Sequence, residues 1–269
     1  MTDPSARYLH ALKLALTRGP GLWVPPARST GWKRHGLAPL QAVLRRRGLQ
    51  LSQLDEARSA TTSAPETLLP LARLDHVQWC IEQALADDVP GDLVEVGVWR
   101  GGAAIFMRAV LAAHGVVDRT VWAADSFAGF PVDRAAAVDR GHDFTGEYGD
   151  DFVAVPLARV QENFRRHDLL DEQVRFLPGW FSETLPTAPI DTIAVLHLDA
   201  DLYQSTSEAL AALLPKVAPG GFVIVDDYHT FTQCRQAVDD HRAAHAITDP
   251  IEAVDDDCVF WRTSNVVDP

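Results

Sequence analysis

The stretch VLHLDADLYQST, residues 195–206, is an apolar run that ends abruptly in acids, and VIVDDYH, residues 223–229, repeats the arrangement. Both runs are typical of buried strands in a parallel sheet, where apolar side chains face helices on either side. Carboxylates at the mouth of a packed sheet cost free energy unless a positive or hydrogen-bonding partner satisfies them. Such positions predict a functional site. The acids concerned are Asp199, Asp201, Asp226 and Asp227.

From residue 71 onward, short apolar runs alternate with longer amphipathic segments, which predicts βαβ units. Strands are expected at residues 92–97, 120–125, 174–179, 192–201 and 222–228, followed by a strand pair at 251–254 and 258–263. Helices are expected at residues 71–88, 101–115, 156–169, 205–221 and 231–245. The fold class is therefore α/β, a Rossmann-like, mostly parallel seven-stranded sheet with helices on both faces. Ligands of such sheets bind at the carboxyl ends of the strands.

The first 70 residues predict a helical extension to this domain, which itself covers residues 71–269. A helix is expected at residues 5–17, with Tyr8, Leu9, Leu12 and Leu16 on one side. Glycine and proline break regular structure at 18–32, a short basic helix is expected at 37–48, and 52–65 reads as a polar loop. The extension completes the acceptor pocket or forms subunit contacts.

Bulk composition excludes several partners. The net charge of −13 argues against nucleic acid and against an anionic membrane surface. No apolar stretch approaches the roughly 20 residues of a membrane span, and the polar N-terminus does not resemble a signal peptide. The three cysteines show no CxxC spacing, which predicts free buried thiols in a reducing cytoplasm.

The glycine-rich stretch EVGVWRGG, residues 95–102, stands between an expected strand and an expected helix. Gly97 permits a tight turn, while Gly101 and Gly102 would let a ligand approach the amides of the helix N-terminus. The spacing is neither GxGxxG nor a P-loop, which disfavours a dinucleotide or a triphosphate. Glu95 would accept a cation or an amine, and Asp125 at the end of the next strand can accept ribose hydroxyls. A ligand that combines a nucleoside with a positive centre and has no phosphate fits the description of S-adenosylmethionine. The alternative reading is a purely structural glycine turn, with Asp125 capping a helix.

Five stretches carry a resemblance to the macrocin O-methyltransferase family, over about residues 68–262. They are residues 73–111, 124–131, 171–190, 196–206 and 220–252. Members of that family use S-adenosylmethionine and Mg²⁺ to methylate sugar hydroxyls of macrolide and aminocoumarin antibiotics. The resemblance implies a class I methyltransferase fold, the same activity and cofactors, a glycosylated small-molecule substrate, and a homodimer.

The resemblance also assigns roles to the acids. Asp199, Asp226 and Asp227 match the metal ligands, and Asp201 matches the general base. The family's common motif has glycine between the two acids of the first run, where this chain has Ala200; the change alters the turn if that position needs a positive φ. The alternative reading is that the acid pairs cap helices or line solvated loops.

Further contacts are expected from the residues at the strand ends and in the glycine-rich loop. S-adenosylmethionine is expected to contact Glu95, Gly97, Val98, Arg100, Gly101, Asp125, Ser126, Gly179, Trp180 and Asp199. Trp180 either stacks on adenine or packs under the sheet edge, and Arg100 either pairs with the methionine carboxylate or lies at the surface. The acceptor is expected near Tyr203, Tyr228 and His229. His197 reads as a hydrogen-bonded core residue.

The connection at residues 126–156 is long, acidic and irregular, which predicts a lid over the cofactor or else a surface insertion. Three rival functions share some of these features: a catechol-type O-methyltransferase, a nucleotide-sugar oxidoreductase and a catalytically silent scaffold. The absent GxGxxG disfavours the oxidoreductase, and the presence of all four acids disfavours the scaffold. The sugar, the hydroxyl, the aglycone and the choice between Mg²⁺ and Mn²⁺ stay open.

Overall fold

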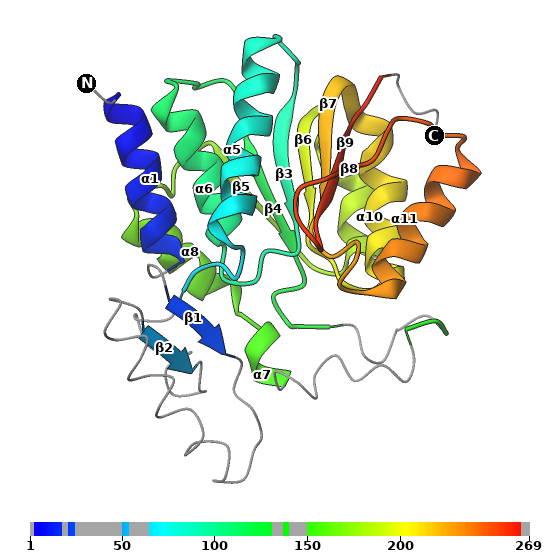
Figure 1. The fold of residues 1–269 in the computed structure, drawn as a ribbon, viewed down its shortest axis with the longest axis horizontal. Coiled ribbons are helices and arrows are strands. Elements are labelled where there is room, and N and C mark those ends of the chain that lie inside the picture. Colours follow the sequence, from blue (N-terminus) through cyan, green and yellow to red (C-terminus); the bar gives the residue numbers. More distant parts are fainter. Residues whose placement is uncertain are drawn as a thin grey trace, which may run out of the picture.

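A seven-stranded sheet forms the centre of the molecule (Figure 1), in the order β5-β4-β3-β6-β7-β9-β8. The computed structural model describes residues 3–17, 21–24, 50–53, 65–130, 137–139 and 150–264. The first five strands in this order are parallel, and β9 runs antiparallel to β7. The strands are β3 Asp92–Val96, β4 Val121–Asp125, β5 Val174–Pro178, β6 Ile193–Leu198, β7 Val217–Val225, β8 Glu252–Ala253 and β9 Val259–Arg262. The predicted α/β fold class is confirmed, including the antiparallel ending.

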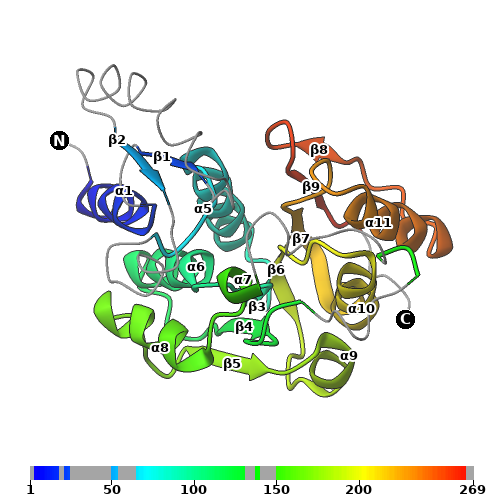
Figure 2. The same cartoon turned by 90° about the horizontal axis from the view of Figure 1, so that it is seen from below.

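Helices cover both faces of the sheet (Figure 2). Alternate strand residues face opposite layers, so Leu93 and Val195 join one apolar cluster while Val94 and Leu196 join the other. The first cluster packs under α5 Leu71–Ala86, α6 Gly102–Ala113 and α8 Leu157–Arg166. The second packs under α10 Tyr203–Leu213 and α11 Thr232–Ala244, with the short α9 Phe181–Thr184 beside them. The two-sided burial explains why these strands are continuous apolar runs.

One expected helix is shorter than predicted. The helix expected over residues 205–221 ends at Leu213, a 3-10 turn follows at Leu214–Lys216, and β7 begins at Val217. Pro215 has no N–H and cannot continue an α-helix, which explains the stop. The following residues, expected in the helix, are therefore strand.

The N-terminal region contains one confirmed helix and one unexpected sheet. Helix α1, Pro4–Leu16, agrees with the expected 5–17 and buries Leu9, Leu12 and Leu16, but Tyr8 is 42% exposed and does not belong to the buried side. Strands β1 Gly21–Val24 and β2 Gln50–Gln53 pair in parallel, where a break and a loop were expected. Four-residue strands are too short to show an alternating pattern. The helix expected at 37–48 lies outside the described residues.

Two further expectations concern cysteines and membranes. Cys80, Cys234 and Cys258 are all buried and free, as predicted. Among the helices that the structure describes, none combines the length and the apolarity needed to cross a bilayer.

Candidate active site

A pocket of about 400 Å³ lies at the carboxyl ends of the parallel strands. This volume is within the range of small-molecule sites, roughly 300–1,000 Å³. The loops that follow β3, β4, β5, β6 and β7 all contribute to its wall. The predicted site residues that line it are Glu95, Gly97, Val98, Asp125, Ser126, Gly179, Trp180, Asp199, Asp201, Asp226 and Asp227.

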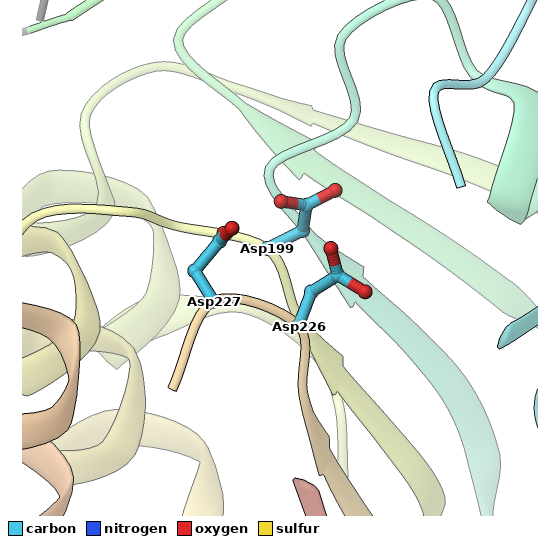
Figure 3. Close-up of side chains that lie close together, drawn as sticks. All are labelled: Asp199, Asp226 and Asp227. Carbon is cyan, nitrogen blue, oxygen red and sulfur yellow. The ribbon is translucent and has the colours of Figure 1, made fainter. Parts of the chain in front are cut away.

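Three of the acids converge from the ends of β6 and β7 (Figure 3). Each of Asp199, Asp226 and Asp227 offers an oxygen, and these oxygens lie within 4.8 Å of one another. Asp226 Oδ1 and Asp227 Oδ2 are buried and accept no hydrogen bond from any residue that the structure describes. Buried acceptors without a donor are costly. Oxygen ligands in this arrangement suit a hard divalent cation.

The acids strongly perturb one another. Burial raises the pKa of Asp199 and Asp201 well above the usual range, and the neighbouring carboxylates raise it further. Burial and the charge of Asp227 raise the pKa of Asp226 to about 7. Burial also raises the pKa of Asp227, although hydrogen bonds from Asp201 and Asp199 oppose the shift. Like charges this close favour protonation unless a cation compensates them, as at many functional sites.

Arg73 is a site residue that sequence reasoning missed. It lies in the first turn of α5, lines the pocket, and its side chain is only 11% exposed. Its Nη1 donates to Asp226 Oδ2 at 2.6 Å, and its Nε donates to Asp255 Oδ2 at 2.7 Å. The partners stand more than 150 positions later in the chain, so no local sequence signal could reveal the contact.

Asp201 stands two residues after Asp199 and lines the same pocket as the trio. Its φ is 57°; burial, and then the charge of the neighbouring Asp227, raise the pKa of its carboxyl group. Aspartate tolerates this left-handed conformation better than most residues do. Ala200 is not among the residues of positive φ, so replacing the family's glycine there does not strain the turn.

The glycines of residues 95–102 are required by packing. A Cβ on Gly97 would lie 1.7 Å from the carbonyl oxygen of Asp199, where β3 and β6 end side by side. A Cβ on Gly101 would meet Val160 of α8 at 2.8 Å. The amide of Gly102 donates to the carbonyl of Glu66 at 2.9 Å. The Gly102 amide is therefore already bonded within the protein, although Gly102 lines the pocket, whereas Gly101 does not line it.

Asp125 ties the glycine-rich loop to β4. Its Oδ2 accepts from the amides of Val98 and Trp99, at 2.7 and 3.2 Å. Its Oδ1 accepts from the amide of Phe127 at 2.7 Å and from the Ser126 hydroxyl at 3.4 Å. These bonds make Asp125 an organiser of the loop. The long bond from Ser126 is the one that a ligand hydroxyl could replace.

Arg100 is not brought to the pocket. It is 4% exposed, its guanidinium lies 5.5 Å from the centre of the Trp99 ring, and it does not line the pocket wall. Asn163 of α8 donates to its carbonyl at 2.8 Å and turns this part of the loop toward α8. The expected surface position is therefore wrong, and pairing with the methionine carboxylate stays a prediction.

The three expected acceptor residues also lie elsewhere. Tyr203 begins α10 and donates its hydroxyl to Asp240 of α11 at 3.1 Å. Tyr228 is 7% exposed and donates to Asp239 of the same helix at 2.6 Å. His229 is exposed, and its ring lies against Tyr228. None of them lines the pocket; from the same loop, Thr230 and Phe231 do.

Glu95 of β3 and His197 of β6 are paired neighbours in the sheet, and both are buried. Glu95 belongs to β3, within the strand expected at residues 92–97; it is 2% exposed and lines the pocket. Burial raises its pKa well above the usual range. His197 is fully buried between Glu95 and Asp226, at 3.9 and 4.0 Å, and burial lowers its pKa to about 4. It is a core residue, as expected, but neither ring nitrogen has a hydrogen-bond partner among the described residues.

Comparison with known proteins agrees with this geometry. The model of the macrocin O-methyltransferase (TylF) family matches residues 35–263. The chain belongs to the macrocin O-methyltransferase family. This membership makes it an O-methyltransferase and removes the oxidoreductase from consideration.

Named relatives of this macrocin-family O-methyltransferase act on glycosylated antibiotics. It is 55% identical over 205 residues to an 8-demethyl-8-(2,3-dimethoxy-alpha-L-rhamnosyl)-tetracenomycin-C 4'-O-methyltransferase of Streptomyces olivaceus, which covers 74% of this chain and 76% of the relative. It is 52% identical over 205 residues to the demethyldecarbamoylnovobiocin O-methyltransferase of Streptomyces niveus, covering 73% and 75%. A third relative, at 47% over 220 residues, is the mycinamicin III 3''-O-methyltransferase of Micromonospora griseorubida, covering 78% and 85%.

Solved structures confirm the fold of this macrocin-family enzyme. The O-methyltransferase NovP superposes with a TM-score of 0.79 at 42% identity, over 97% of this chain and all of that one. The calicheamicin methyltransferase CalS11 has a TM-score of 0.60 at 21% identity and supports the fold alone. The class I methyltransferase fold implies S-adenosylmethionine as the methyl donor.

Proposed function

We propose that the protein transfers a methyl group from S-adenosylmethionine to a sugar hydroxyl of a glycosylated natural product of the macrolide or aminocoumarin type, with Mg²⁺ bound by Asp199, Asp226 and Asp227. The observation that carries the proposal is the pair of buried carboxylate oxygens without a donor, Asp226 Oδ1 and Asp227 Oδ2, beside the pocket. The named substrates of the three relatives support a glycosylated acceptor.

The acidic trio fits a divalent cation by its chemistry. Carboxylate oxygens are the ligands that Mg²⁺ prefers, and three of them from two strand ends can occupy one face of an octahedron. A bound Mg²⁺ would lower the pKa of a hydroxyl that coordinates it, as metals do for water. The trio would hold the ion, and the remaining positions would face the acceptor.

Asp201 is the proposed general base. It lines the pocket next to the trio, and its φ of 57° is set by the turn between β6 and α10. Burial raises the pKa of Asp201, so its ionised form is a stronger base than a solvated aspartate. Its role is to take the proton of the acceptor hydroxyl. S-adenosylmethionine supplies a methyl group on a positive sulfur, which a nucleophilic oxygen attacks in line.

The other half of the pocket is proposed to hold the cofactor. Glu95 is a buried carboxylate that suits an amine. Asp125 accepts a hydrogen bond from the amide of Val98 and so holds the glycine-rich loop in the pocket wall. Gly179, with a φ of 139°, brings Trp180 to the wall, where an indole can stack on adenine. Val98 and Ser126 complete the cofactor contacts proposed for this wall.

The first test is calorimetric titration of S-adenosylmethionine, once with Mg²⁺ and once with EDTA. Binding under both conditions is expected, because the nucleoside half and the acidic half of the pocket have different ligands. Absence of binding under both conditions would contradict the methyltransferase proposal itself.

The acceptor class is tested by turnover. A panel of deoxysugar glycosides and a flat catechol would be assayed with labelled S-adenosylmethionine, with the Asp199→Asn and Asp226→Asn variants as controls. We expect Mg²⁺-dependent transfer to a glycoside, lost in both variants. Transfer to the catechol alone would replace the proposed acceptor by an aromatic diol.

The subunit arrangement also stays a proposal. A homodimer acting in the cytoplasm, with residues 1–70 as an extension that contributes to the acceptor pocket or the interface, is the expected state. Light scattering on the full chain measures the mass, and turnover after removal of the extension tests its role.

A further inference from the structure

Arg73 reaches the acidic site from the opposite wall of the pocket. It stands in the first turn of α5, whereas Asp226 ends β7, and Asp255 and Asp257 lie between β8 and β9. The guanidinium therefore connects three segments that are far apart in the sequence. Both Arg73 and Asp257 line the pocket.

Every N–H of this guanidinium has an acceptor. Nε and Nη2 donate to the two oxygens of Asp255, at 2.7 and 3.0 Å. Nη1 donates to Asp226 Oδ2 at 2.6 Å and to the Asp226 carbonyl at 3.4 Å, and Nη2 also donates to Asp257 at 3.3 Å. An arginine has five donors, so none is left for a substrate. Arg73 acts on the site through the acids that it holds.

Arg73 bonds only one of the two carboxylate oxygens of Asp226. Oδ2 is bonded to Arg73, while Oδ1 is buried, lies 4.0 Å from His197 Nε2 and accepts no hydrogen bond from any described residue. A carboxylate with two available oxygens can bind a cation through either or both. The bond from Arg73 occupies Oδ2 and leaves one carboxylate oxygen, Oδ1, available. Because the guanidinium is a planar donor, it also fixes the orientation of the Asp226 carboxylate.

We propose that Arg73 is a positioning residue that holds Asp226 by one carboxylate oxygen and presents the other, Oδ1, to the metal site. The inference rests on the proposed function, because it assumes that the trio binds Mg²⁺. Asp255 in turn holds the guanidinium: burial alone would raise the pKa of Asp255, but the bonds from Arg73 and from the amides of Cys258 and Asp257 lower it to about 2.

Electrostatic repulsion of the cation by Arg73 does not dominate. The guanidinium carries one positive charge, and its three acidic partners, Asp226, Asp255 and Asp257, together carry three negative charges when ionised, which leaves a net charge of −2. The group as a whole therefore attracts a divalent ion. Loss of Arg73 leaves Asp226 without its fixed orientation.

The test is calorimetric titration of Mg²⁺ alone into the full chain, without acceptor. Arg73→Gln is expected to raise the Kd for Mg²⁺ by about 10- to 100-fold, the usual effect of removing a partner of a ligating group. Arg73→Lys keeps the charge and one contact and should restore part of the affinity. Asp255→Asn, which releases the other end of the guanidinium, should weaken binding less than Arg73→Gln does. The affinity for S-adenosylmethionine should stay within about twofold.

Arg108→Gln is the matched control. Arg108 is buried to a similar degree, pairs with Asp171 at 2.6 Å, and does not line the pocket. A comparable loss of thermal stability with unchanged Mg²⁺ affinity is expected for this control. Should Arg73→Gln fail to fold, Arg73→Lys and Asp255→Asn carry the comparison.

Equal or tighter Mg²⁺ binding by the Arg73 variants, with native binding intact, would overturn the inference alone. Native protein that binds S-adenosylmethionine but no Mg²⁺ would overturn the metal proposal together with it. The two failures are therefore distinguished within one set of titrations.

Discussion

At the scale of single residues, glycine is required at position 97 for two independent reasons. Its φ is +86°, and an added Cβ would overlap the carbonyl of Asp199. We expect Gly97→Ala to lower the free energy of unfolding by at least about 3 kcal/mol, because backbone on both sides must move. Gly115→Ala is the control: its φ is +68° with open space around it, which predicts a loss of about 1 kcal/mol. Urea denaturation measures both, and equal losses would contradict the packing argument.

Asp201 has a proposed role that its neighbours do not share. Replacing it by asparagine removes the base without removing a proposed metal ligand. We expect Asp201→Asn to lower kcat by about 10²- to 10⁴-fold, the range of general-base catalysis. Calorimetry should show unchanged binding of S-adenosylmethionine and of Mg²⁺ within a few-fold. Full turnover by this variant would assign the proton transfer to another group.

The raised pKa of Asp226 predicts a pH dependence with a definite sign. Its value of about 7 in the folded protein exceeds the usual 3.8, so the folded state holds a proton that the unfolded state releases. The contribution of this group to stability is therefore present below about pH 4 and is lost as the pH rises through 7. At low pH a cation must displace that proton in order to bind Asp226, whereas at high pH the carboxylate is already ionised.

We therefore expect the rise in Tm produced by Mg²⁺, relative to EDTA, to be small at pH 5.5 and larger at pH 8. Thermal melts with Mg²⁺ and with EDTA at both pH values measure it. The buried histidines change stability with pH in the opposite direction, and comparing the Mg²⁺ and EDTA melts at the same pH cancels their contribution. Asp226→Asn should reduce the difference between the two pH values, although Asp199 and Asp227 also have raised pKa values. An Mg²⁺ effect independent of pH would contradict the assignment.

At the scale of elements, α1 is bound to the sheet domain by its buried side. Leu9, Leu12 and Leu16 belong to the same apolar cluster as α5 and α6. Lys13 is 5% exposed and donates to Asp75 at 2.5 Å and to Gln78 at 2.6 Å, both on α5. These contacts hold α1 against the sheet domain.

This packing predicts a large effect of one leucine. Leu16 is fully buried, so Leu16→Ala should lower the free energy of unfolding by about 2–5 kcal/mol. Tyr8→Ala, on the 42% exposed neighbour, should cost about 0.5 kcal/mol or less. Chemical denaturation of the full chain compares the two. A small effect of Leu16→Ala would mean that α1 contributes little to the domain's stability.

Helices and strands could be predicted from the sequence where the hydrophobic pattern extends over many residues. The strands and helices from residue 71 onward follow the sequence pattern, because burial on two faces forces continuous apolar strands. The helix end at Leu213 was missed because only one polar residue, Lys216, separates Pro215 from the apolar start of β7. The parallel pair β1 and β2 was missed because its two strands are short and separated in sequence.

At the scale of the whole molecule, the chain between β4 and α8 contributes to the pocket. Phe130, Phe152 and Val153 line it, and the Trp99 indole N–H donates to the Phe152 carbonyl at 2.8 Å. The short helix α7, Asp150–Val153, is thereby joined to the glycine-rich loop. A ligand in the pocket would contact both.

We expect S-adenosylmethionine to slow proteolytic cleavage within residues 126–156 by several-fold, because binding would hold both ends of this connection. Limited proteolysis with and without cofactor, read by mass spectrometry, measures it. Cleavage within residues 114–119, the mostly exposed turn between α6 and β4, serves as the internal reference because no residue of that turn lines the pocket. Equal cleavage rates in the connection would favour a surface insertion over a lid.

The sequence by itself determined the α/β fold, the edge of the sheet where the site lies and the acids that occupy it. These features depend on local patterns, since apolar runs, glycine turns and acids at strand ends are each contained in a few consecutive residues. Only the tertiary structure decided which neighbours point into the pocket. It turned Tyr203, Tyr228 and Arg100 away and brought Arg73 onto Asp226. The direction of a side chain depends on the elements packed against it, and those elements come from distant parts of the chain.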